Sequence, residues 1–199
     1  MQMVTVPAFD NVSIPSRPGF TLEPLGRLNY RITLWGGFFP GWIGSFTGRL
    51  ADRGLNIIGG SARKVTPAAW HAVFEFEATA GVDVAKINFM DLADSSLDRT
   101  PPKAIRLDDY RVVANQDGCI SVHISGRDQL GLLSSLLKKF HLYMLFPNEV
   151  TVATTAGRVT DFFRLRGMGG VSPSREALTA LEDALRSMVH GVEGLTGHC

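Results

Sequence analysis

The stretch at residues 120–137, ISVHISGRDQLGLLSSLL, decides the fold of this chain. It begins with apolar residues at every second position, Ile120, Val122 and Ile124. This period of two predicts a half-buried strand. A polar turn bracketed by Gly126 and Gly131 follows, and the apolar residues then recur at helical spacing, as Leu132, Leu136 and Phe140. A strand, a tight loop and a helix in this order make half of a split βαβ unit.

The same unit occurs ninety residues earlier in the chain. Its strand pattern consists of Tyr30, Ile32 and Leu34. Gly41 falls opposite Gly131, and the helical row that follows is Trp42, Phe46 and Leu50. Because an internal repeat determines the architecture of a protein, the sequence predicts two copies of one small α+β module in tandem.

Length and composition favour a globular protein with two domains. The chain has 199 residues, enough for two domains of roughly 80 to 100 residues each. Its formal net charge of +1, from 20 basic and 19 acidic residues, does not indicate a nucleic-acid-binding face. The sequence contains neither an apolar run of about 18 residues, as a membrane span requires, nor the features of a signal peptide. With only Cys119 and Cys199, we expect a reduced, cytoplasmic setting.

The expected organisation is an arm followed by two modules. Residues 1–28 are rich in proline and glycine and predict an extended arm with a short strand at residues 3–6. Module 1 is expected at residues 29–114. Its predicted strands lie at residues 30–35, 56–65, 70–77 and 105–114, and its predicted helices at residues 42–53 and 83–97.

Module 2 is expected at residues 119–199, after a linker at residues 115–118. Its predicted elements are the strand and helix of residues 120–140, a hairpin of residues 147–155 and 158–166, and a helix that Ser172 caps and that ends near His190. One edge strand is missing, and residues 3–6 are a candidate to supply it. The expected fold is therefore α+β, with two ferredoxin-like βαββαβ modules, antiparallel sheets and helices on one face.

Two groups of short motifs resemble the ACT domain, a ferredoxin-like regulatory module that often occurs in pairs. In the second copy they are residues 128–133 (DQLGLL), 155–158 (TAGR) and 161–163 (DFF), and in the first copy residues 40–41 (PG) and 54–57 (GLNI). The second copy is most similar to the ACT repeats at the C-terminus of bacterial nitrogen-sensing uridylyltransferases. The two copies cover residues 30–114 and 119–190.

Each copy departs from the pattern of the family. The first has Gly37, Phe38 and Phe39 where the family usually places an acidic residue before the Pro-Gly pair. The second has Phe146 where the asparagine of the Leu-Asn-Ile segment is expected, with Asn148 two places further on. Each copy therefore has part of the usual polar set, so that one copy binds a ligand while the other serves for packing, or neither binds.

The resemblance implies an amino-acid site between modules, where N–H groups at a helix start hold a carboxylate. The candidate ligand-binding residues are Pro40, Gly41, Trp42, Asn56, Ile57, Asp128, Gln129, Leu130, Gly131 and Leu132. A structural role for each of them stays open. The glycines can simply make the turn, Asp128 can cap the helix, and Asn56 can make a hydrogen bond within a turn.

Other kinds of site have less support in the sequence. Four arginines, Arg127, Arg158, Arg164 and Arg166, form either an anion-binding patch or a solvated strand face. The His and Cys residues show no metal-ligand spacing, and no catalytic motif stands out, so we expect neither a metal, a cofactor nor catalytic residues.

The leading hypothesis is a non-enzymatic, allosteric regulatory protein that senses an amino acid or a related metabolite. The ligand would shift the packing of modules or subunits, and a homodimer is expected because exposed sheet edges tend to be covered. The alternative is a ligand-independent interaction or dimerisation module that regulates a partner enzyme. A third hypothesis is an enzyme on a ferredoxin-like frame, because such folds host many chemistries.

Overall fold

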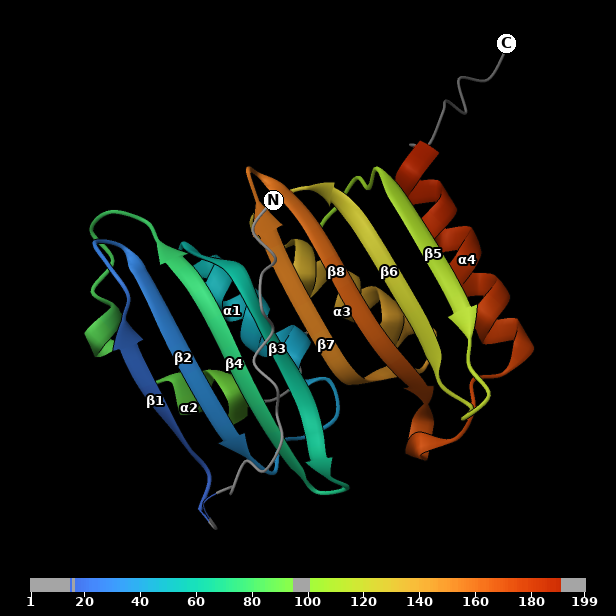
Figure 1. Ribbon diagram of the computed structural model, residues 1–199, viewed down its shortest axis with the longest axis horizontal. Coiled ribbons are helices and arrows are strands. Elements are labelled where there is room, and N and C mark those ends of the chain that lie inside the picture. Colours follow the sequence, from blue (N-terminus) through green and yellow to red (C-terminus); the bar gives the residue numbers. More distant parts are fainter. Residues whose placement is uncertain (1–14, 16, 95–100, 191–199) are drawn as a thin grey trace.

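The computed structural model describes residues 15, 17–94 and 101–190 of the chain (Figure 1). This part of the chain forms the strands β1 (Gly19–Pro24), β2 (Asn29–Gly36), β3 (Leu55–Thr66), β4 (Ala69–Ala78), β5 (Asp109–Ala114), β6 (Ile120–Arg127), β7 (Leu145–Thr155) and β8 (Arg158–Gly167). Its helices are α1 (Trp42–Asp52), α2 (Phe89–Asp94), α3 (Leu132–Leu142) and α4 (Arg175–His190), with short 3₁₀ turns η1 (Val84–Lys86) and η2 (Met168–Gly170).

All of these strands belong to one antiparallel sheet in the order β1-β2-β4-β3-β7-β8-β6-β5. The order consists of two halves of four strands, each half being one module, and the modules meet at β3 and β7. Figure 1 shows α1, α2 and α3 behind the sheet, whose other face is turned toward the viewer. The predicted α+β class, with two ferredoxin-like modules, antiparallel strands and helices on one face, is confirmed.

The alternating residues of the two repeats supply the sheet side of the core. β2 buries Ile32 and Leu34, and the matching strand β6 buries Val122 and Ile124. These side chains face the helices and join their apolar rows in a single hydrophobic cluster that runs through both modules. Complete burial of each such side chain contributes about 1.5–3 kcal/mol.

The strand β5 lies in a different module from the one predicted for it. Residues 105–114 were expected as the fourth strand of the first module, but β5 pairs with β6 of the second. A tight hairpin turn joins the two strands, in which the N–H of Gly118 donates to the carbonyl of Asn115, and the N–H of Asn115 donates to the carbonyl of Cys119. A turn this short brings β5 directly beside β6.

The fourth strand of the first module is β1, which lies inside the predicted N-terminal arm and pairs with β2. Its last residue is Pro24, which an outer strand tolerates because one side of its backbone needs no ladder hydrogen bond. The second module was predicted to lack one edge strand, and β5 takes that place. Residues 3–6, the candidate for this strand, lie outside the described residues. This pairing favours a module boundary before β5, and the boundaries at residues 29–114 and 119–199 stay a prediction.

Two helices also differ from the prediction. Instead of one helix over residues 83–97, the described part of this segment forms η1 and the short helix α2, separated by the extended residue Ile87. A weak apolar stripe does not hold a longer helix on the core. The last helix begins at Arg175 rather than just after Ser172, because the hydroxyl of Ser174 accepts the N–H of Ala177 and so caps it.

The pairing of β3 with β7 joins the two modules into one sheet. It extends from Gly59, opposite Ala153, to Arg63, opposite Glu149, with Ser61 opposite Thr151 in the middle. Ser61 and Thr151 lie ninety residues apart, the spacing of the repeat. A pseudo-two-fold axis therefore passes between these two residues and relates the modules.

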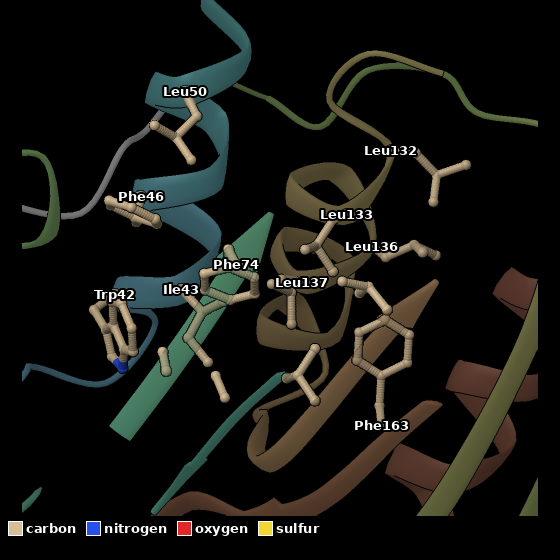
Figure 2. Close-up of a cluster of buried hydrophobic side chains, with 14 of the residues drawn as sticks. Trp42, Ile43, Phe46, Leu50, Phe74, Leu132, Leu133, Leu136, Leu137 and Phe163 are labelled. Carbon is tan, nitrogen blue, oxygen red and sulfur yellow. The ribbon is translucent and has the colours of Figure 1, made fainter. Parts of the chain in front are cut away.

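Helices α1 and α3 cross on the covered face of this joint (Figure 2). Figure 2 shows Ile43, Leu133 and Leu137 between the two helices, while Trp42, Phe46 and Leu50 lie on the other side of α1. A Cβ atom on Gly44 of α1 would lie 3.3 Å from the Cβ of Leu137, and the hydroxyl of Ser134 donates to the Gly44 carbonyl over 2.9 Å. The absence of a side chain at Gly44 therefore allows the close approach.

We predict that Gly44→Val destabilises the protein by about 1–3 kcal/mol, because the added methyl groups overpack the helix crossing. The matched control is Asp52→Val, at an exposed position of the same helix, which is expected to change the free energy of unfolding by less than about 1 kcal/mol. Urea denaturation of the three proteins measures the difference. Equal midpoints for Gly44→Val and the parent chain would show that the crossing is not tightly packed.

Candidate ligand-binding site

The loop before α3 forms one wall of a polar cleft between the modules. Gly131 is the N-cap residue of α3 and has a φ of 87°, in the left-handed region, which favours glycine. The N–H of Leu132 donates to the carbonyl of Gln129 over 2.9 Å and closes the turn. Within the described residues, the N–H groups of Leu130 and Gly131 donate to no protein acceptor. The loop therefore presents two donors at the positive end of a helix.

Asn56 and Asp128 connect the two modules across this cleft. The side-chain amide of Asn56, at the start of β3, donates to a carboxylate oxygen of Asp128 over 2.8 Å. Asp128 makes no side-chain cap on α3, and Asn56 makes this contact 72 residues away in the chain rather than within a turn. The structural roles that the sequence left open for these two residues, a helix cap and a local turn, are therefore not the ones they have.

The cleft encloses a small cavity between α1, β3, the loop before α3, and the ends of β7 and β8. The cavity volume is about 30 Å³, which is room for about two water molecules. Both modules supply its lining, which consists of Thr47, Ala51, Leu55, Asn56, Ile57, Asp128, Gln129, Gly131, Leu132, Leu133, Ser134, Val152, Thr154, Val159 and Asp161. In this closed arrangement the cleft has polar groups for a ligand but holds no room for one as large as an amino acid.

Asp161 of β8 is a buried carboxyl group in the wall of the cavity. Its exposed fraction is 3%, and it shares the helix-facing side of β8 with the buried residues Val159 and Phe163. Burial raises the pKa of Asp161 to about 7, since a charge is poorly solvated there; the N–H of Ala153 partly offsets this, and the nearby charge of Asp128 adds to the increase. Near neutral pH, the group is thus poised between its neutral and charged forms.

The position that the pseudo-two-fold axis relates to this cleft is apolar. Phe38 takes the place of Asp128, Phe146 that of Asn56, and Ala72 that of Asp161. The rings of Phe38 and Trp42 lie 4.4 Å apart, centre to centre, and Trp42 also contacts Trp70 at 5.8 Å. Polar groups suited to a ligand are therefore found on one side of the axis, and aromatic packing on the other.

The structure brings six of the ten predicted binding residues together in the cavity wall: Asn56, Ile57, Asp128, Gln129, Gly131 and Leu132. Pro40, Gly41 and Trp42 lie at the apolar position, where Trp42 is 1% exposed, and the side chain of Leu130 points outward with 46% exposed. That these residues bind a ligand stays a prediction.

Sequence reasoning missed two charged residues near the loop and in the cavity. Asp161 could have been found from its pattern, because it is an acidic residue at an inward position of an alternating strand. Lys103 gives no such signal. Its ammonium nitrogen lies 3.8 Å from the position that a Cβ atom on Gly131 would occupy, and its backbone N–H donates to the hydroxyl of Ser135 over 3.2 Å.

Three of the four arginines considered as an anion-binding patch are paired with neighbouring groups. Arg158 contacts Asp108 at 2.6 Å, Arg164 pairs with Asp117, and Arg166 donates to the sulfur of Cys119 over 3.0 Å. This pairing favours a structural role over an anion-binding patch. Among the described residues, no three His, Cys, Asp or Glu side chains gather as a metal site would need, and no helix is long and apolar enough to cross a membrane.

Comparison with known proteins adds a distant likeness in fold. No protein-family model matches the chain, and no curated protein matches it. Among solved structures, the chain is similar to the crystal structure of aspartate kinase from Synechocystis, with 14% sequence identity and a TM-score of 0.47. The match covers 81% of this chain and 27% of that chain, so this chain spans about a quarter of that protein's length. A likeness at this level carries no argument about function.

We predict that Asp161→Asn makes the protein more stable than the parent chain as the pH rises. The raised pKa means that the folded state binds the Asp161 proton more tightly than the unfolded state does. The destabilisation caused by this carboxyl therefore grows as the pH rises from 4 to about 7, and stays constant above about pH 7. The free energy of unfolding of Asp161→Asn, minus that of the parent chain, should therefore be about 2–4 kcal/mol larger at pH 8 than at pH 4.

Urea denaturation from pH 4 to pH 8 measures this gain, and Asp183→Asn on the outer face of α4 is the control, because Asp183 is exposed and paired with Arg186. The control should show no such increase with pH. A parallel pH dependence of the parent chain and Asp161→Asn would mean that Asp161 has an ordinary pKa in the folded state.

Proposed function

We propose that this chain is a non-enzymatic regulatory protein that binds an amino acid in the cleft between its modules. The observation that carries the proposal is the hydrogen bond between Asn56 and Asp128, which places polar groups of both modules in one cavity wall. A ligand that contacts both groups interacts with both modules at once. Its binding therefore depends on how the modules are packed.

The groups around the cleft are arranged for a ligand with one ammonium and one carboxylate. Asp128 is a carboxylate that can accept hydrogen bonds from an ammonium group. The N–H groups of Leu130 and Gly131, at the start of α3, can hold a carboxylate with the help of the helix dipole. The ammonium of Lys103 lies over the same loop and adds a positive charge. These groups of opposite charge lie close together along the loop and favour a zwitterion.

Binding would change the packing of the modules. Because the closed cavity of about 30 Å³ holds about two water molecules, an amino acid has to move the walls apart and replace the bond between Asn56 and Asp128. The ligand would then stabilise an open arrangement over the closed one by its differential affinity for the two. We propose that a partner enzyme responds to this change of arrangement.

The wider setting of the protein follows from the resemblance in its sequence. We propose two ACT-type modules, the second similar to the C-terminal repeats of nitrogen-sensing uridylyltransferases, acting in the cytoplasm. We also propose a homodimer, because each outer strand, β1 and β5, pairs on one side only within the described part of the chain. Such edges are commonly covered by another chain.

We predict that calorimetric titration with the common amino acids shows binding of one molecule per chain. One rather than two is expected because the position related by the pseudo-two-fold axis is filled by Phe38, Trp42 and Trp70. Asp128→Ala should weaken binding at least tenfold through loss of the ammonium partner, and Asn56→Ala less. Asp183→Ala, on α4, is the control and should bind like the parent chain.

Titrations that show no binding of any common amino acid would overturn this proposal. They would favour the ligand-independent interaction module, which predicts instead a stoichiometric protein partner that co-purifies with the chain. Binding that Asp128→Ala leaves unchanged would place the ligand outside this cleft.

A further inference from the structure

Asp161 is a buried carboxyl group in the cavity wall. It has no role in the contacts proposed above for the α-ammonium and α-carboxylate of an amino acid. It lies between Ile124 of β6 and Val152 of β7 in the sheet, and both neighbours are apolar. Ala72 occupies the matching position of the first module and packs there without a polar group. A carboxyl is therefore not needed to build this fold, and a buried charge without a partner costs stability.

The groups that face Asp161 supply no positive charge. The cavity lining contributes Thr47 and Ala51 from α1, Asn56 from β3, Val152 and Thr154 from β7, and Leu132, Leu133 and Ser134 from α3. Asp128, from the loop, is the charged group among these described residues, and its charge is also negative. The cavity thus has two carboxyl groups in its wall and no lysine, arginine or histidine.

We propose that Asp161 binds a cationic group at the inner end of the ligand, so that the cleft selects a basic amino acid and releases a proton to solvent on binding. The inference rests on the proposed function and names the class of ligand. The three charged side chains become more buried in turn: Lys103 is exposed, Asp128 is half-buried and Asp161 is buried. In that order they would match an α-carboxylate, held also by the loop N–H groups, an α-ammonium and a side-chain cation. A neutral side chain would leave the Asp161 carboxylate without a cationic partner.

The proton release follows from the state of Asp161 before binding. With a pKa of about 7, the carboxyl is about nine-tenths protonated at pH 6 and about one-tenth protonated at pH 8. An ammonium or guanidinium ion pairs with the carboxylate, so the proton has to leave the carboxyl for the buffer. Binding of a basic amino acid should therefore release about 0.9 proton at pH 6 and about 0.1 at pH 8, and its affinity should be about tenfold lower at pH 6.

The experiment is calorimetric titration of the full chain with lysine, arginine and norleucine at pH 6, 7 and 8. Norleucine has the straight side chain of lysine without its terminal ammonium. Each titration is repeated in buffers of different ionisation enthalpy, which counts the protons released. We expect lysine or arginine to bind at least tenfold more tightly than norleucine at pH 8, with the proton release given above.

Asp161→Asn keeps the shape of the side chain and removes its charge. It should bind the basic amino acid at least tenfold more weakly at pH 8 and release no proton, while Asp183→Asn should behave like the parent chain. The comparison of lysine with norleucine uses the parent chain alone, and so does not depend on how the variant folds.

The outcomes separate this inference from the proposed function. Tighter binding of norleucine or another neutral amino acid, or binding of lysine without proton release at pH 6, would overturn the role of Asp161 and leave amino-acid binding in place. Absence of binding by every amino acid would overturn both.

Discussion

The antiparallel pairing of β3 with β7 is the interaction on which the rest of the structure depends. It makes one sheet from two modules and sets them about a pseudo-two-fold axis at Ser61 and Thr151. The same joint brings α1 against α3, where Gly44 allows the helices to approach and Ser134 donates a hydrogen bond across the contact. The cleft forms beside this joint, so that any shift between the modules changes the cleft as well.

The pseudo-two-fold axis relates two positions between the modules, and their side chains have become different. On one side, Asn56, Asp128 and Asp161 surround a polar cavity. On the other, Phe38 and Trp42 pack together. One position thus contributes hydrophobic stabilisation of the joint, and the other leaves a small cavity with polar groups in its wall. A pair of modules with two aromatic positions would be held more firmly, but would have no polar groups with which to bind.

The buried carboxyl group of Asp161 costs the protein stability when it is ionised. Burial of Asp161 raises its pKa because the charged form is poorly solvated, and the negative charge of Asp128 opposes ionisation further. A ligand cation would offset this cost, so that the energy stored in the closed cleft would contribute to the preference for the liganded arrangement.

The sequence by itself determined the duplication, the α+β class, the core rows of β2 and β6, and the identity of Asn56 and Asp128 as polar groups near glycine turns, because these depend on local periodicity and spacing. Tertiary structure decided the rest. Alternation predicts a strand but not its neighbour, so the places of β1 and β5 were settled by their hairpin turns. Packing of residues far apart in the chain likewise produces the contact of Asn56 with Asp128, the burial of Asp161 and the position of Lys103. Burial and the proximity of charges are properties of the folded arrangement, so local sequence patterns do not predict them.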